Sequence, residues 1–112
     1  MTSCSRGDVV LVKLVFADEK GAKQLPGLIL STDSYHEGRR EAILAAITSN
    51  IGRLLVGDCT ISAWREAGLL YPSIVTGIVR TIKHDMIASR MGALPASEMR
   101  AAEDSLRAIL AV

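Results

Sequence analysis

Runs of aliphatic residues separated by short polar stretches fill most of the chain up to Lys83. The runs are rich in Val, Ile and Leu and are bounded by glycine, proline or charged residues, a pattern typical of buried strands. The alanine-rich pattern of Ala42–Ile47 also fits a helix, but its length and the flanking turn residues favour a strand. The predicted strands are Asp8–Phe16, Pro26–Ser31, Ala42–Ile47, Asp58–Ile61 and Ser73–Lys83.

The segments between these strands carry turn signals. Ala17–Leu25 and Thr32–Arg40 are polar and contain glycine, so both are predicted as loops or short turns. Trp64–Leu70 is predicted to make a brief helical turn that a glycine ends. Pro26 lacks an N–H group and fits best as the first residue of a strand or on a sheet edge. Gly77 interrupts a β-branched run and predicts a bulge or bend.

Two helices are predicted after the strands. A glycine follows His84–Met91 and would stop it, and a proline stands just before the first turn of Ala96–Leu110. Apolar residues recur at helical spacing in the second helix and form one stripe. The stripe residues are Met99, Ala102, Leu106, Ile109 and Leu110. The predicted fold is mainly β with C-terminal helices, a small antiparallel barrel or half-barrel that forms a single domain over residues 1–112.

The composition is apolar for so short a chain. Of its 112 residues 49% are hydrophobic and 4% aromatic, and the mean hydropathy is +0.29. A domain this small buries only about two thirds of the surface that its unfolded chain exposes. We therefore expect a partner subunit to cover some apolar surface, most simply in a homodimer. The net charge of +1 argues against a dedicated nucleic-acid coat protein, although it is compatible with a local basic patch.

Cys4 and Cys59 are the only cysteines of the chain, and neither lies in a CxxC motif or beside other metal ligands. The first residues, MTSCSRGD, lack the apolar core of a signal peptide. No run approaches the ~18 apolar residues of a membrane span. We therefore expect a cytoplasmic protein with reduced thiols, and we expect no metal, no cofactor and no membrane contact.

Several stretches, taken in order, carry a family resemblance. They are RGDVVLV, a charged loop, PGLILS, ILAAITSN, AGLLYPSIV, RTI and MGAL before a helix. The series covers Arg6 to Leu110 and resembles the MazF/PemK/Kid family of bacterial toxin endoribonucleases, the mRNA interferases. The resemblance implies an SH3-like barrel with a C-terminal helix, a homodimer, metal-independent cleavage of single-stranded RNA, and neutralisation by a cognate antitoxin protein.

Metal-independent RNA cleavage needs a base for the ribose 2′-OH, an acid for the leaving oxygen, and donors that stabilise the phosphorane. The resemblance ties catalysis to a strand-end threonine, matched by Thr48 with Ser49 beside it, and to an arginine before a proline. On the residues alone, Thr48 and Ser49 could equally satisfy a strand terminus. In place of the arginine this chain has Leu25, which can neither donate a proton nor neutralise charge. Lys23 shares a strand face with position 25 and is the candidate substitute, although it could be an ordinary loop lysine.

Four further basic residues are candidates for contacts with RNA phosphates: Lys20, Arg39, Arg40 and Arg80. The arginine pair could instead form a solvated turn, and Arg80 could pair with an acidic neighbour. On an unbroken strand Arg80 shares a face with Ile78 and Ile82. His36 could do acid–base work, although a solvated loop residue is favoured, and Trp64 could stack a base, although core or interface packing is favoured.

The leading hypothesis is the toxin of a toxin–antitoxin module that cleaves single-stranded RNA with Thr48, Ser49 and Lys23. The first alternative is a catalytically weakened member that binds RNA, an antitoxin or another protein without cleavage, because the fold does not need the missing arginine. A second alternative comes from the related CcdB-type toxins, which bind a topoisomerase through their C-terminus. The C-terminal SLRAILAV fits a packed amphipathic helix equally well.

Overall fold

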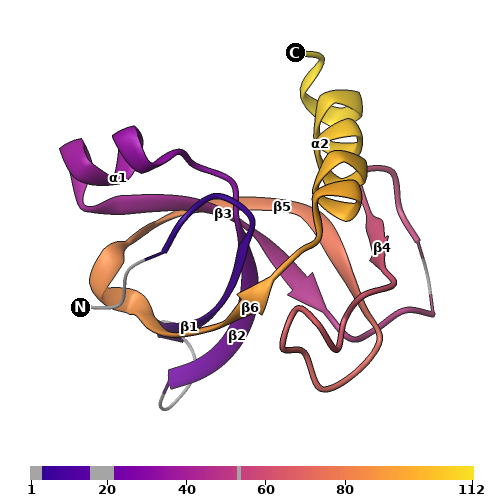
Figure 1. The fold of residues 1–112 in the computed structure, drawn as a ribbon, viewed down its shortest axis with the longest axis horizontal. Coiled ribbons are helices and arrows are strands. Elements are labelled where there is room, and N and C mark those ends of the chain that lie inside the picture. The colour runs from indigo at the N-terminus through magenta and orange to yellow at the C-terminus, as the bar shows by residue number, and fades with distance from the viewer. Residues whose placement is uncertain (1–3, 16–21, 53) are drawn as a thin grey trace.

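One antiparallel sheet is the main element of the fold and curls into a half-barrel, beside which the C-terminal helix lies (Figure 1). The structure is a computed structural model that describes residues 4–15, 22–52 and 54–112. Within these residues the sheet has six strands in the order β4-β5-β3-β2-β1-β6. The elements are β1 (Asp8–Val15), β2 (Ala22–Ile29), α1 (Asp33–Arg39), β3 (Glu41–Thr48), β4 (Cys59–Ile61), β5 (Ser73–Lys83), η1 (His84–Met86), β6 (Ile87–Ala93) and α2 (Ala96–Leu110).

The register of the sheet divides the apolar side chains between two cores. Val9 and Leu28 are paired and face the first core, whereas the next residues along, Val10 and Ile29, face the second. The first core lies between the sheet, α2 and the segment after β4. The second gathers side chains from the N-terminal segment and from β1, β2, β3, β5 and β6. Strands with apolar residues on both faces read as continuous hydrophobic runs, which is the pattern seen in the sequence.

Much of the predicted architecture is confirmed. The chain is mainly β, and β5 and α2 have the predicted bounds. The pairing of β3 with β5 shifts register between Ala45 and Ile47, opposite Thr76 to Ile78, so the predicted bulge at Gly77 is confirmed. Trp64 lies in a tight turn, as predicted, and packs against the first core. Phe16, the predicted end of the first strand, lies outside the described residues.

The helix predicted over His84–Met91 is wrong. This segment makes the short turn η1 and then continues as β6, which pairs antiparallel with β1. Ile87 pairs with Val12 and is buried. The edge of β1 offers the segment a ladder of backbone hydrogen bonds, and such tertiary pairing outweighs the helical preference of a short run.

The prediction that Thr32–Arg40 is only a loop is also wrong, because the segment contains α1. Thr32 caps this helix, and its Oγ1 accepts a hydrogen bond from the backbone N–H of Tyr35 at 3.4 Å. Asp33 stands in the first turn, where a carboxylate favours the helix dipole, and Arg40 ends the helix in a left-handed conformation. None of the helix residues is fully buried. A short helix without an apolar stripe leaves no periodicity to detect.

Strand β2 begins within the segment predicted as the loop Ala17–Leu25, and Pro26 is therefore not the first residue of its strand. Pro26 pairs with Leu11 of β1, whereas pairing of β2 with β3 starts only at Gly27. The proline thus stands where β2 has one neighbouring strand instead of two. This position meets the requirement that a residue without an N–H avoid the middle of a complete ladder.

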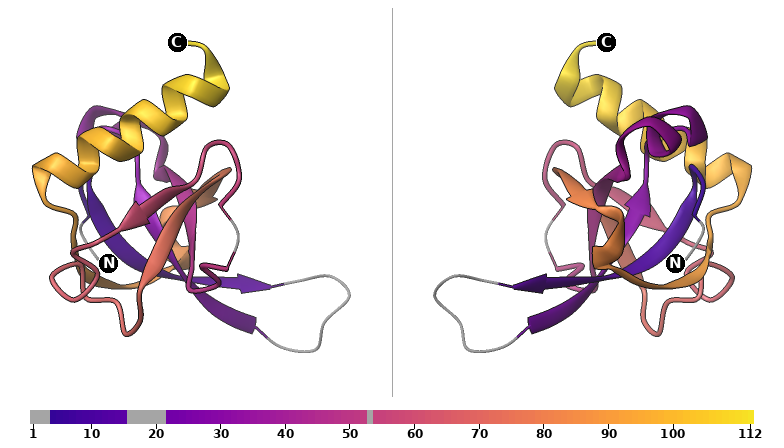
Figure 2. Two further views of the ribbon diagram at one scale, coloured as in Figure 1. Left: turned by 90° about the vertical axis from the view of Figure 1, so that its right-hand side faces the viewer. Right: turned by 90° about the vertical axis from the view of Figure 1, so that its left-hand side faces the viewer.

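Helix α2 leans against the sheet and the segment around β4 (Figure 2). Its buried residue is Ala102, and its Ile109 packs where Gly57 and Gly77 meet. A Cβ atom on Gly77 would lie 3.0 Å from Cδ1 of Ile109, so this approach depends on glycine. The Glu98 carboxylate accepts hydrogen bonds from backbone N–H groups of the turn after β4, at 2.5 and 3.1 Å. Among the described residues no helix is long and apolar enough to cross a membrane.

Candidate functional site

Leu25 of β2 and Thr48, the last residue of β3, come together at one hollow. Gly27 pairs with Ala46 and Leu28 pairs with Ala45. The pairing of β2 with β3 begins at Gly27, so Leu25 and Thr48 lie just beyond the end of this ladder. Both residues line the same hollow.

Leu25 and Thr48 border a hollow of about 290 Å³, which is close to the lower end of ligand-sized cavities. Its walls come from β1, β2, β3, β6 and the segment before β5. The lining residues are Leu11, Leu25, Pro26, Ile47, Thr48, Ser49, Leu69, Leu70, Tyr71, Ser73 and Met91. None of these carries an acidic or basic side chain. The hollow therefore combines apolar walls with hydroxyl groups.

The hydroxyl of Thr48 already has one partner. Its Oγ1 accepts a hydrogen bond from the backbone N–H of Asn50 at 3.1 Å, which stabilises the turn that leaves β3. A hydroxyl has one proton to donate and two lone pairs, so this contact leaves the proton of Thr48 available. Ser49 beside it is exposed. The hydrogen bond that stabilises the end of β3 thus leaves the Thr48 hydroxyl able to donate a hydrogen bond of its own.

The structure describes only one of the two lysines that the sequence prediction named. Lys23 is exposed on β2, two residues ahead of Leu25 and on the same face, roughly 7 Å along the strand. It is not among the residues that line the hollow in the described part of the chain. Lys20 lies outside the described residues.

Arg80 borders a second hollow, of about 190 Å³, which shares Leu25 and Pro26 with the first. Ile78 and Ile82 line it too, which confirms that these two residues and Arg80 share a strand face. The remaining wall residues are Val12, Leu44 and Ala46. Arg80 pairs with Leu44 of β3. Along this strand Leu44 and Thr48 are roughly 13 Å apart, so Arg80 is distant from Thr48.

Arg39 and Arg40 lie at the opposite end of β3 from Thr48, roughly 25 Å away along the strand. The Arg39 guanidinium donates a hydrogen bond to the Glu41 carboxylate at 3.1 Å, and this bond is the main cause that raises the pKa of Arg39. The guanidinium also lies 5.1 Å from the centre of the Tyr35 ring. The structure therefore does not bring this arginine pair together with Thr48.

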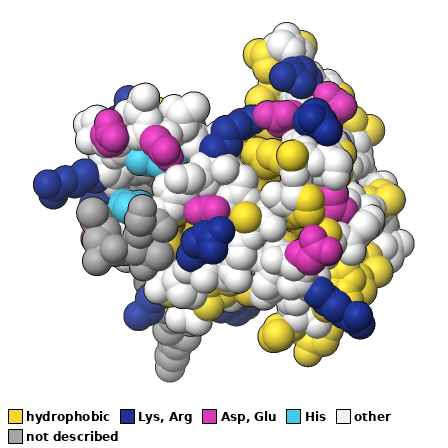
Figure 3. All heavy atoms as spheres, in the orientation of Figure 1, with side chains coloured by type: hydrophobic (Ala, Val, Ile, Leu, Met, Phe, Trp, Pro, Cys, Tyr) yellow, Lys and Arg dark blue, Asp and Glu magenta, His cyan; other side chains and the backbone are white. Residues whose placement is uncertain are grey.

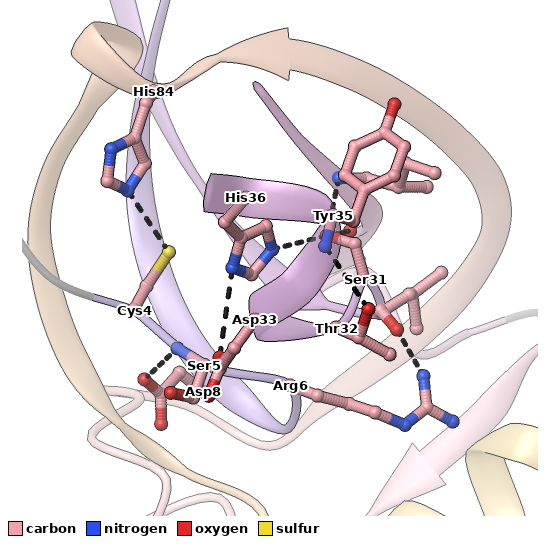
Figure 4. Close-up of polar contacts among 12 residues, drawn as sticks. Cys4, Ser5, Arg6, Asp8, Ser31, Thr32, Asp33, Tyr35, His36 and His84 are labelled. Atoms are coloured by element: carbon pink, nitrogen blue, oxygen red, sulfur yellow. Dashed lines mark hydrogen bonds and ion pairs between the residues drawn. The ribbon is translucent and has the colours of Figure 1, made fainter. Parts of the chain in front are cut away.

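His36 turns inward from α1, and its side chain is only 9% exposed, so it is not a solvated loop residue (Figure 4). Its Nε2 lies 2.5 Å from Oγ of Ser31, which accepts a hydrogen bond from a backbone N–H of β3. Its Nδ1 is 3.9 Å from an Asp33 carboxylate oxygen. Nearby, the Cys4 thiol lies 3.5 Å from Nε2 of His84, and burial is the main cause that raises the pKa of this thiol. These contacts fasten α1 and the N-terminal segment to the barrel, away from Thr48.

Sequence reasoning missed Leu70 and Tyr71, which are 77% and 64% exposed at the rim of the first hollow. The available signal was an aromatic residue directly before Pro72, next to two leucines. In Figure 3 hydrophobic side chains reach the surface at the lower right, over the loops around β4. Within residues 4–15, 22–52 and 54–112, no group of three or more His, Cys, Asp or Glu residues could hold a metal ion.

Solved structures of toxins share this fold. The Mycobacterium tuberculosis toxin MazF-mt6 is 24% identical with a TM-score of 0.76, over 94% of this chain and 97% of that chain. MazF from a MazE–MazF structure of Deinococcus radiodurans is 15% identical with a TM-score of 0.80, over 97% of both chains. A mycobacterial endoribonuclease in complex with its cognate antitoxin is 15% identical with a TM-score of 0.79, over 98% of this chain and 97% of that chain. No curated protein matches this sequence.

The family model of the PemK-like, MazF-like toxins matches residues 5–110, which is almost the whole chain. The match spans β1 to α2 and so includes both strands that meet at Leu25 and Thr48. The chain belongs to the PemK-like, MazF-like toxin family of type II toxin–antitoxin systems.

Proposed function

We propose that this chain is the toxin of a toxin–antitoxin module and a metal-independent endoribonuclease that cleaves single-stranded RNA, including mRNA. The observation that carries the proposal is the position of Thr48 and Ser49. They line a hollow at the C-terminal end of β3, together with Leu25 and Pro26 of β2, and Lys23 lies two residues before Leu25. Apolar walls suit bases, and hydroxyl donors beside a lysine suit phosphate oxygens.

The proposed reaction is an attack of the ribose 2′-oxygen on the adjacent phosphorus. The bond from the 2′-oxygen to phosphorus forms, and the bond from phosphorus to the 5′-oxygen breaks. The products are a 2′,3′-cyclic phosphate and a 5′-hydroxyl end. Water takes the proton of the 2′-OH, because no lining residue of the hollow carries a carboxylate or an imidazole. The leaving 5′-oxygen gains a proton from the Lys23 ammonium or from water.

Thr48 and Ser49 donate hydrogen bonds to non-bridging oxygens of the phosphorane in this proposal. The Asn50 N–H holds the Thr48 oxygen in place, and the hydroxyl proton is the one that would be donated to the phosphorane. Removing one preorganised donor to a developing negative charge typically lowers the rate by ~10²–10³-fold. Lys23 contributes a point charge without the bidentate geometry of an arginine.

A second candidate function is binding without cleavage, and the residue at position 25 favours it. Leu25 lines the same hollow as Thr48, where a cation could contact the phosphate. Among the described residues that line the hollow none is charged, so in this part of the chain stabilisation of the phosphorane depends on hydroxyls and on the nearby Lys23. A chain with this arrangement could retain affinity for RNA, an antitoxin or another protein while cleaving slowly.

The chain is proposed to act as a homodimer that a cognate antitoxin neutralises. An open apolar groove between the sheet and α2 supports this assembly, because several of its residues remain exposed. Its apolar residues are Leu30, Ile43, Val79, Leu106, Leu110 and Val112. Arg6, Glu103 and Arg107 border the groove and could fix the orientation of a partner.

Incubation with a long single-stranded RNA in the presence of EDTA, followed by mapping of the fragment ends, tests the proposed function. Discrete cuts with 2′,3′-cyclic phosphate ends are expected, and Thr48→Ala is expected to abolish them. Thr60→Ala is the matched control, because Thr60 is an exposed threonine on β4 outside the hollow. If the folded protein binds RNA but does not cut it, the second candidate function replaces the first.

A further inference from the structure

Tyr71 presents an aromatic ring to solvent beside the hydroxyls of the site. The ring lines the same hollow as Thr48 and Ser49, and the residue is 64% exposed. Within the described chain the Tyr71 ring makes no contact with another aromatic ring or with a cation. Leu70 beside it is 77% exposed and lines the same hollow, so the two residues form a contiguous apolar patch that suits a ligand with an apolar face.

The backbone that carries this ring is fixed. Pro72 restricts Tyr71 to extended geometry, and the Tyr71 carbonyl accepts a hydrogen bond from the buried hydroxyl of Ser73 at 2.8 Å. On the other side, Leu69 is buried, and its N–H donates to the Trp64 carbonyl at 2.9 Å. The backbone at Tyr71 is thus held from both sides, so binding of a ligand to the ring costs little ordering of the main chain.

We propose that Tyr71 stacks on a nucleobase of the single-stranded RNA next to the scissile phosphate, an inference that rests on the proposed function. Three features of the hollow select a nucleotide as occupant. Its apolar walls suit the faces of a base, its hydroxyls suit a phosphate, and none of its lining residues is a carboxylate that would repel one. Stacking on an aromatic ring is tolerant of sequence, because every base has a π-face.

The effect of removing the ring is measured as binding of a fluorescein-labelled RNA oligonucleotide that spans a mapped cut and carries a 2′-deoxynucleotide there to prevent cleavage. Where the protein binds without cutting, the unmodified oligonucleotide serves. Tyr71→Ala is expected to weaken binding by roughly 5- to 150-fold, the range that one stacked base contributes. Tyr71→Phe keeps the ring and is expected to stay within about twofold of the native protein, because stacking does not need the hydroxyl. Tyr35→Ala is the matched control, because Tyr35 lies on α1 at the far end of β3.

An abasic scan separates stacking from a structural role. With the stacked base removed from the RNA, Tyr71→Ala is expected to cause no further loss, whereas a variant that distorts the site would lose affinity with every oligonucleotide. If the native protein binds RNA and Tyr71→Ala binds it equally well, the inference is overturned while the proposed function stands. The ring is then left as a contact for a protein such as the antitoxin. An equal loss in Tyr71→Phe overturns stacking in favour of the phenol hydroxyl. Failure of the native protein to bind or cut RNA overturns the proposed function and this inference together.

Discussion

Replacing Leu25 with arginine places a cation at the hollow that Thr48 also lines. Leu25 is 38% exposed and borders both hollows, so a longer side chain at this position can extend into solvent without moving the backbone. Leu25 and Thr48 line the same hollow. The guanidinium of Leu25→Arg can therefore reach a phosphate that contacts the Thr48 hydroxyl.

Two effects of Leu25→Arg have opposite signs. Full burial of a leucine stabilises a fold by ~1.5–3 kcal/mol, so the partly buried Leu25 contributes about 1–2 kcal/mol, some of which the arginine stem retains. We expect a loss of roughly 1 kcal/mol, or a fall in Tm of about 4–8 °C. A preorganised donor to the phosphorane is worth ~10²–10³-fold in an enclosed site. Because this site is open to solvent, we expect cleavage to rise by about 10- to 100-fold.

Single-turnover cleavage of a defined RNA, with EDTA present, measures this gain without product release. Leu25→Gln is the matched control, because it adds polarity and length without charge. Leu25→Lys separates charge from the bidentate geometry of a guanidinium and is expected to give a smaller gain. The gain from Leu25→Arg is expected to disappear in combination with Thr48→Ala, because both groups act on one phosphate.

A folded Leu25→Arg variant that cleaves no faster than the native protein would refute this reasoning. It would mean that a side chain at position 25 does not face the scissile phosphate. An equal gain from Leu25→Gln would also refute it, since charge would then not be the cause. A Tm measurement beside each assay keeps loss of folded protein from hiding a gain in rate.

Three further predictions concern the lysine, a glycine and an ion pair. Lys23→Ala is expected to lower RNA cleavage by about tenfold, with Tm measured alongside to account for any loss of folded protein, and intact cleavage would exclude Lys23 as the substitute cation. Gly68→Ala is expected to destabilise the fold by ~3 kcal/mol or more, because Gly68 has a φ of 81° and a Cβ there would lie 2.1 Å from a backbone oxygen of β6. Gly38→Ala, in open space on α1, is the control in thermal unfolding and is expected to cost nothing. The hydrogen bond from Arg6 lowers the pKa of Glu103, so its stabilisation is present above the ordinary carboxyl pKa of 4.5 and is lost as pH falls through the lowered value. Glu103→Gln is therefore expected to unfold with a weaker pH dependence in acid than the native chain, as followed by circular dichroism.

The parts of the fold that were predicted correctly are those with strong local signals. The long β-branched run of β5 and the apolar stripe of α2 gave the observed bounds, because each pattern repeats over enough residues to be recognised. The bulge at Gly77 was predicted because a glycine inside a β-branched run weakens a regular strand and is typical of a bulge. α1 and β6 were mispredicted because the first has no buried residue and the second depends on a distant strand.

The residues of the candidate site likewise divide into those that a sequence motif identifies and those that only the fold places. Thr48 and Ser49 were identified by their place in a motif, and the substitution at Leu25 was visible as a departure from it. Arg39 and Arg40 looked equivalent to Arg80 as basic candidates, yet the fold sets the pair at the far end of β3 and Arg80 on the wall of a hollow. Tyr71 carried no motif, and its exposure is known only once the segment before β5 is placed.

The order of apolar and polar residues determined the class of fold, the main strands and the last helix, because each of these depends on neighbours within a few positions. The closeness of Leu25 and Thr48, the inward position of the His36 side chain and the hollow beside Tyr71 depend instead on which strands pair and in which register. Register joins residues that lie far apart in the chain, and a slip of one residue would turn the strand side chains to the other face of the sheet. For this reason the chemistry of the site could be anticipated residue by residue, whereas its geometry required the packed fold.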